Sequence, residues 1–167
     1  TVFAWARAVP ELSSTPQQIA AYQSALGSSP AAIALAGPPF GLDSIGGIVV
    51  YEAGITALLG IALMAIFLTN RHTRAEEEAG RTEVVRSTVV GRFAPLAGTL
   101  IVVAAACLLV GAGVAAGVAS TGVAVEGAVL FGAAVAAFGI AMASVTAAVA
   151  QLMTHGRGVI GVTLAVL

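Results

Sequence analysis

The sequence predicts an all-α protein that crosses a membrane several times, and composition is the first observation behind this prediction. Hydrophobic residues make up 59% of the 167 residues and charged residues only 9%. The mean hydropathy is +1.02. A soluble domain carries roughly a quarter charged residues, so this chain has too few to cover a surface that faces water. Its excess of Ala, Val, Gly, Leu and Ile is typical of helices that pack closely in lipid.

The distribution of charge is the second observation. Residues 70–92 hold nine of the fifteen charged residues of the chain and stand between two long apolar runs. Because ionised side chains are costly inside a bilayer, this segment must be a loop, and the runs beside it must cross. We therefore expect a polytopic helical transmembrane bundle.

Residues 1–44 are expected to form a loop outside the membrane that contains two short amphipathic helices. The run 14–16 ends in a proline and is typical of a helix start, and Gly27 is typical of its end. A second helix is expected to begin at residues 29–30 and to end at Gly37. Both are shorter than the ~20 residues of a crossing, so we expect them to lie on the membrane surface. In the first helix, the spacing of Ile19, Tyr22 and Leu26 predicts one apolar stripe.

Three spans are expected after this loop, at residues 45–69, 93–118 and 123–150. The link at 119–123 is so short that it forces the second and third spans into an antiparallel hairpin. Residues 158–167 are expected to begin a further span. We interpret the 167 residues as a piece of a longer protein.

Small residues in the second and third spans predict close helix packing. Gly113 and Gly117 have the spacing that lets another backbone approach. Ala128, Gly132 and Ala136 repeat every fourth residue and offer a second such face. The lone Cys107 lies in an apolar run and is interpreted as a small packing residue.

Two carboxylates lie inside or near the ends of the spans. Glu52 is the single charge of the first span, and Glu126 follows the short turn before the third. Each can lie near the interface, where it reaches water, or face a cavity between helices. Both interpretations stay open.

The arginines predict the orientation of the spans. Six of the seven Arg fall in the loops 70–92 and 151–157, which share one side of the membrane, and Arg7 falls on the other. Short Arg-rich loops stay in the cytoplasm. We therefore expect both loops to face the cytosol and residues 1–44 to face outward.

The charged loop has helical features in its first half. Thr73 and Glu76 have the spacing of a capping box, in which each satisfies a free N–H at the other's position. Glu77 and Glu78 precede Arg81 by four and three residues, and both spacings favour a helix.

The second half of the loop is expected to continue after a bend at Gly80. A second short helix is expected to start near Glu83 and to carry Val85 and Val89 on one face until Gly91 ends it. A bent pair of helices with an apolar stripe and charged flanks suits the docking of a partner. The alternative is a solvated loop whose arginines only set the topology.

The residues of this loop resemble a known family. The run from Arg71 to Val85, followed by Val90, Gly91 and Arg92, is similar to the motif of actinobacterial ABC-type exporter permeases. These are the polyketide-antibiotic exporters, or tetronasin-type transporters. The run Gly-Pro-Pro-Phe at 37–40 is similar to that family as well, and the resemblance extends from about residue 30 to the end of the chain.

The resemblance implies an ABC-2-type permease in a bacterial plasma membrane, with about a dozen spans in two halves. By this resemblance the present chain is an incomplete half, and 70–92 is its cytoplasmic coupling loop. ATP-binding subunits would dock there and would hold the ATP and Mg²⁺. The residues expected to take part in coupling are Arg71, Arg74, Glu76, Glu77, Glu78, Gly80, Arg81, Glu83, Val85, Arg86, Val89, Gly91 and Arg92.

The function expected on these grounds is export of amphipathic compounds, such as antibiotics or drugs, by an ATP-driven transporter. The chain has no Lys, so it lacks a phosphate-binding loop of the Gly-x4-Gly-Lys-Ser/Thr type. No catalytic, cofactor or metal residues are expected. The alternatives are a non-catalytic anchor or channel subunit and, with little support, an intramembrane enzyme that uses Glu52 or Glu126. A nucleic-acid role is not expected, because Glu residues match the Arg cluster and aromatic residues are missing from it.

Overall fold

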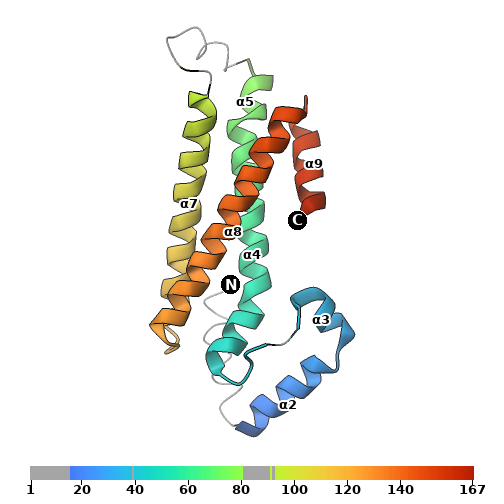
Figure 1. The fold of residues 1–167 in the computed structure, drawn as a ribbon, viewed down its shortest axis with the longest axis vertical. Coiled ribbons are helices and arrows are strands. Elements are labelled where there is room, and N and C mark those ends of the chain that lie inside the picture. The colour runs from blue at the N-terminus through green and yellow to red at the C-terminus, as the bar shows by residue number, and fades with distance from the viewer. Residues whose placement is uncertain (1–15, 39, 81–90, 92) are drawn as a thin grey trace. The chain divides into compact units, whose positions relative to one another are not determined.

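The computed structural model describes residues 16–38, 40–80, 91 and 93–167. Every regular element in these ranges is an α-helix (Figure 1), which confirms the predicted all-α class. The helices are α2 (Pro16–Gly27), α3 (Pro30–Ala36), α4 (Ile45–His72), α5 (Arg74–Glu78), α7 (Ala94–Ala119), α8 (Val125–Leu152) and α9 (Gly156–Val166).

Three of these helices are long and apolar enough to cross a membrane: α4 with 28 residues, α7 with 26 and α8 with 28. At ~1.5 Å per residue each is roughly 40 Å long, which exceeds the ~30 Å of a hydrocarbon core. The chain is thus a multi-pass membrane protein. The connection between α8 and α9 is shorter than the predicted loop at 151–157, because both helices extend into it.

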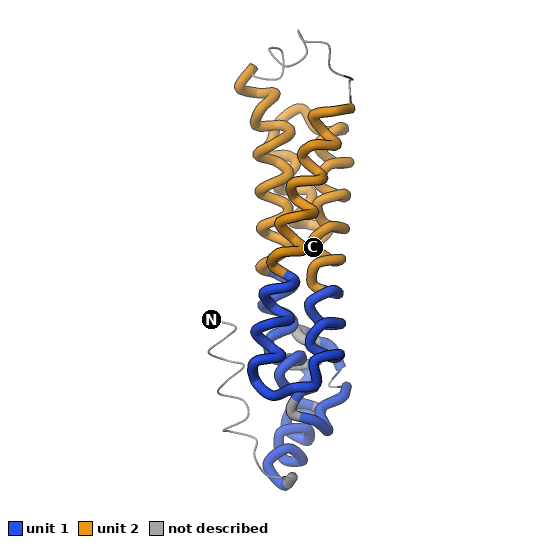
Figure 2. Tube along the Cα trace, turned by 90° about the vertical axis from the view of Figure 1, so that its left-hand side faces the viewer, with its two compact units in different colours: residues 1–59, 111–134 blue, residues 60–110, 135–167 orange. Residues whose placement is uncertain are grey.

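The chain divides into two compact units, which Figure 2 colours separately. Unit 1 comprises residues 1–59 and 111–134, and unit 2 comprises residues 60–110 and 135–167. Each long helix contributes one part to each unit.

The core of unit 1 is a small apolar cluster to which the short helix α2 adds side chains. Its fully buried members are Leu42, Ile48, Val49, Val118 and Ala128. The stripe predicted on α2 packs against this cluster through its three side chains. The structure thus confirms the stripe and shows that protein covers it.

In unit 1, α7 and α8 approach each other closely at Gly132. A Cβ atom added there would lie 2.4 Å from the carbonyl oxygen of Gly111 and 2.7 Å from the Cβ of Ala115. The predicted close-packing face of α8 is confirmed at this position. The contact predicted through Gly113 is wrong, since a Cβ at Gly113 would meet nothing within 4 Å. Two residues along a helix rotate the side chain by about 200°, so Gly113 points away from the face that Gly111 presents.

The core of unit 2 brings α4, α7 and α8 together at Gly139. A Cβ atom there would lie 2.8 Å from both the Sγ of Cys107 and the Cγ1 of Ile61. Cys107 is fully buried and free. Its predicted role as a small packing residue is therefore confirmed.

Candidate functional site

The described part of the charged loop lies in unit 2, at the end of α4 and in α5. Arg71 belongs to the last turn of α4, and Gly80 and Gly91 lie outside the helices. Helix α5 contains Arg74, Glu76, Glu77 and Glu78. The other predicted coupling residues, which are Arg81, Glu83, Val85, Arg86, Val89 and Arg92, lie outside the described residues, as does the predicted second helix.

The capping box predicted at the start of α5 is wrong. Thr73 precedes the helix, but its side chain makes no capping hydrogen bond. Its Oγ1 instead donates to the carbonyl oxygen of Thr69 at 2.7 Å. At φ −117° and ψ −89° the backbone of Thr73 is not in the extended conformation that a capping residue uses. The hydroxyl therefore bonds back to the carbonyl four residues earlier, a common alternative for Thr.

The bend predicted at Gly80 coincides with the end of α5. Gly80 has φ +72°, a left-handed conformation that strains any residue with a Cβ. Its N–H donates to the carbonyl of Glu77 at 3.0 Å, which closes the last turn. The helical direction of α5 therefore stops here.

Arg74 connects α5 to the C-terminal end of α8. Its Nε donates to the carbonyl oxygen of Ala150 at 2.9 Å, and its Nη1 forms an ion pair with Glu77. The last four carbonyls of a helix have no partner within it and carry partial negative charge. Helix α8 has no basic residue in its last turn. Arg74 thus supplies the cation that this helix end lacks.

Glu78 connects α5 to the N-terminal end of α9. Its Oε1 accepts a hydrogen bond of 2.7 Å from the backbone N–H of Gly156, the first residue of α9. His155, in the capping position, makes no side-chain capping bond, and the first turn of α9 contains no acidic residue. The Glu78 carboxylate therefore takes the place of a cap and faces the positive end of the helix.

The end of α4 contacts α9 and α7. The Asn70 side chain is buried and lies against Gly156, where an added Cβ would meet its Nδ2 and Oδ1 at 3.3 Å. The Thr99 hydroxyl of α7 has two acceptors for its one hydrogen, the carbonyl oxygens of Pro95 at 3.0 Å and of His72 at 3.2 Å. Helix ends of α4, α7, α8 and α9 are therefore joined around α5, and we call Arg74, Glu78, Ala150 and Gly156 the clasp.

Sequence reasoning missed half of the clasp. Ala150 and Gly156 act through backbone atoms, so no side-chain motif indicates them. The sequence gives one indirect indication. The end of α8 has no basic residue and the start of α9 has no acidic residue, so neither helix end carries a charge that suits its dipole. Asn70 was visible only as the first residue of the charged loop.

The two carboxylates of the spans have different surroundings. Glu52 is half-buried, and its Oε1 accepts a hydrogen bond from the Tyr22 hydroxyl of α2. Glu126 is exposed in the first turn of α8. Both lie in unit 1. Among the described residues, no group of three or more His, Cys, Asp and Glu side chains could hold a metal ion.

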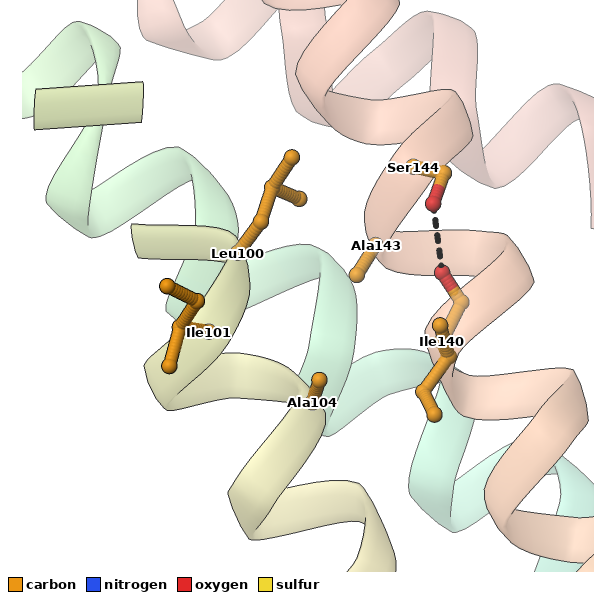
Figure 3. Close-up of a pocket in the computed structure, with 6 residues that line it drawn as sticks. All are labelled: Leu100, Ile101, Ala104, Ile140, Ala143 and Ser144. Carbon is orange, nitrogen blue, oxygen red and sulfur yellow. Dashed lines mark hydrogen bonds between the residues drawn. The ribbon is translucent and has the colours of Figure 1, made fainter. Parts of the chain in front are cut away.

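An apolar pocket of about 230 Å³ lies between α7 and α8 in unit 2 (Figure 3). The residues that line it are Leu100, Ile101, Ala104, Ile140, Ala143 and Ser144. The Ser144 hydroxyl donates to the carbonyl of Ile140 at 2.9 Å, so its hydrogen is used within α8. The pocket can therefore accept hydrocarbon groups, and it offers little for a polar ligand.

Comparison with known proteins shows a similarity to a curated membrane protein. No family model matches the chain. The chain is 44% identical over 148 residues to the multidrug efflux system permease protein Rv1217c of Mycobacterium tuberculosis (strain ATCC 25618 / H37Rv). The match covers 89% of this chain and 27% of that relative, so the chain spans about a quarter of the length of the curated protein that it matches.

Proposed function

We propose that this chain is part of the membrane permease of an ATP-driven ABC-2-type exporter. In this proposal, residues 70–92 receive the movement of a separate ATP-binding subunit, which holds ATP and Mg²⁺. Residues 70–92 and the α8–α9 connection face the cytosol, and the membrane is the bacterial plasma membrane. The observation that carries the proposal is that α5, a short charged helix, is bonded to the ends of two other helices.

The similarity to a multidrug efflux permease supports the transporter class. It extends over nine-tenths of this chain. The described residues contain no candidate metal site, and the sequence has no phosphate-binding loop. A permease whose energy comes from a partner accounts for both the membrane helices and the charged segment.

The geometry of α5 supports a coupling role. None of its residues is buried, and Glu77 and Glu78 are exposed enough to meet a partner. The helix is nevertheless fixed to α8 through Arg74 and to α9 through Glu78. A solvated loop that only sets topology does not need such bonds, because its arginines act by charge alone.

The apolar character of the helices supports the proposed substrate class. Their surfaces and the pocket between α7 and α8 are apolar, with one serine that is already bonded. Such surfaces suit amphipathic or apolar small molecules, including antibiotics and drugs. Polyketide antibiotics are the narrower class that the resemblance of the charged segment indicates.

The test is reconstitution of the full-length permease with the ATP-binding protein encoded beside it. We expect the two proteins to purify together and to move an amphipathic dye across a vesicle membrane when ATP is hydrolysed. Flux of the dye without ATP hydrolysis would indicate a channel and would contradict the proposal. Failure of any ATP-binding subunit to associate would favour a simple membrane anchor.

The variants Arg81→Ala and Glu83→Ala test the part of the segment that lies outside the described residues. We expect both to hydrolyse ATP in an assembled complex while export falls. Unchanged export in both variants would count against a docking role for this part of the segment.

A further inference from the structure

We infer that Arg74 and Glu78 are positioning residues that make the C-terminal end of α8 and the N-terminal end of α9 move together with α5. This inference rests on the proposed function, because it says how movement delivered to α5 spreads through the permease. Helix α5 follows α4 directly in the chain, and the clasp adds direct bonds from α5 to α8 and α9. With the clasp, one displacement reaches three helices.

The charges of the clasp match the helix ends that they meet. Arg74 is a cation at the negative end of α8, and Glu78 is an anion at the positive end of α9. Within α5 the two residues are four positions apart, so they lie on the same face of the helix. A reversed order of the charges would place like charges against both helix ends. The order Arg-x3-Glu is therefore the one that allows both bonds.

The neighbouring helices depend on these charges, because they lack their own. The last turn of α8 contains no basic residue, and the first turn of α9 contains no acidic residue. Helix α4 differs, since Arg71 and His72 lie in its own last turn. The connection between α8 and α9 is thus stabilised from α5 at both of its ends.

Two further contacts keep the clasp in register. Glu77 forms an ion pair with Nη1 of Arg74 and leaves Nε free to reach Ala150. The buried Asn70 side chain packs against Gly156, so the N–H that Glu78 accepts is held beside the end of α4. Any larger residue at position 156 would have to displace Asn70.

The first test measures how many substrate molecules are exported for each ATP hydrolysed by the reconstituted full-length complex. Glu78→Ala removes the acceptor, and we expect the ratio to fall about tenfold, as the loss of one hydrogen bond to a charged group predicts. Glu78→Gln keeps an oxygen at the same place and should restore most of the ratio. The matched control is Asp43→Ala, which removes an exposed carboxylate in unit 1 and should leave the ratio unchanged.

The second test measures a distance and does not depend on transport. Spin labels at A79C and R157C report on α5 and α9, while the fully buried Cys107 can stay in place. We expect one narrow distance distribution in the full-length permease in lipid, with and without nucleotide and the ATP-binding subunit. Glu78→Ala should broaden it, and Glu78→Gln should broaden it less.

The two tests separate this inference from the proposed function. If the wild-type complex shows no ATP-dependent export, the proposed function fails, and the distance between α5 and α9 still tests the clasp. If export is ATP-dependent but Glu78→Ala changes neither the ratio nor the distance distribution, the inference is overturned while the proposed function stands. A fall in the ratio that Glu78→Gln restores supports the clasp.

Discussion

The two units hold their short helices by different means. In unit 1, α2 packs an apolar stripe onto a buried cluster and adds one hydrogen bond from Tyr22 to Glu52. In unit 2, α5 has no buried residue and is held by charged groups on the backbone ends of other helices. Apolar burial is non-directional, and it resists separation of the buried helix from its neighbours. A few hydrogen bonds instead fix the orientation of a helix, and they can break and form again at a small cost in free energy. We interpret α2 as a helix that stays packed over the core of unit 1, and α5 as a helix that changes position during transport.

The largest expected effect comes from adding a methyl group at the glycines where the long helices pack against each other. Gly132→Ala in unit 1 places a Cβ 2.4 Å from a backbone oxygen, which cannot move without its helix. For Gly139→Ala in unit 2, the three atoms nearest to the new Cβ belong to the Cys107 and Ile61 side chains, which can shift more easily than backbone. We expect a loss of about 2 kcal/mol of unfolding free energy for the first and about 1 kcal/mol for the second.

Thermal unfolding of the purified permease in detergent checks this order. Gly113→Ala on α7 is the matched control, since its Cβ meets nothing within 4 Å. An alanine there should be neutral or slightly stabilising, because helical alanine is favoured over glycine. Equal losses for all three variants would contradict the packing described for both units.

A smaller effect is expected when the stripe of α2 is weakened. Leu26→Ala removes apolar surface that packs against the core of unit 1. We expect the free energy of local opening of α2 to fall by about 1 kcal/mol. Hydrogen exchange of the α2 amides measures this. Gln17→Ala, exposed on the same helix, should leave the exchange unchanged; faster exchange in both variants would mean that the stripe is not what holds α2.

The hydrogen bond from α2 to Glu52 should contribute slightly less to the stability of α2 than the apolar stripe does. Tyr22→Phe keeps the ring but removes the hydroxyl that donates to half-buried Glu52, so we expect a loss of about 1 kcal/mol or less. Glu52→Gln retains an acceptor and should cost less than Tyr22→Phe. The reverse order in hydrogen exchange would show that Glu52 has a different partner.

The smallest expected effect concerns Thr73. Since its hydroxyl bonds back to Thr69 and does not cap α5, Thr73→Val should change the unfolding free energy by only about 0.5 kcal/mol. The loss of a helix cap typically costs about twice as much. Thermal unfolding of the variant and the wild type distinguishes these two losses of unfolding free energy. A loss of the larger size would indicate that Thr73 does cap α5.

The sequence predicted those parts of the fold that depend on local signals. Pro16 begins α2 and Gly27 ends it, and the charged segment separates α4 from α7 as expected. These features follow from backbone chemistry and from the cost of charge in lipid. The bend at Gly80 belongs to the same class, because its positive φ suits glycine.

The parts that depend on contacts between helices could not be predicted. The spacing of Gly113 and Gly117 was sound, but the rotation of α7 presents Gly111 and Ala115 to α8. The spacing of Thr73 and Glu76 fitted a cap, but a nearer carbonyl competed for the hydroxyl. The partners of Arg74 and Glu78 are backbone atoms 76 and 78 residues away, and no local pattern specifies them.

The most direct measurement for the whole account is site-specific cross-linking from α5. A photoreactive cross-linker on A79C, at the exposed end of α5, is activated in the assembled full-length complex, and the attached protein is identified by mass. We predict a cross-link to the ATP-binding subunit, together with labelling of A79C by impermeant reagents in inside-out vesicles alone. Labelling of that cysteine from the outer medium, with no cross-link to any ATP-binding subunit, would contradict the proposal that α5 couples the permease to its energy source.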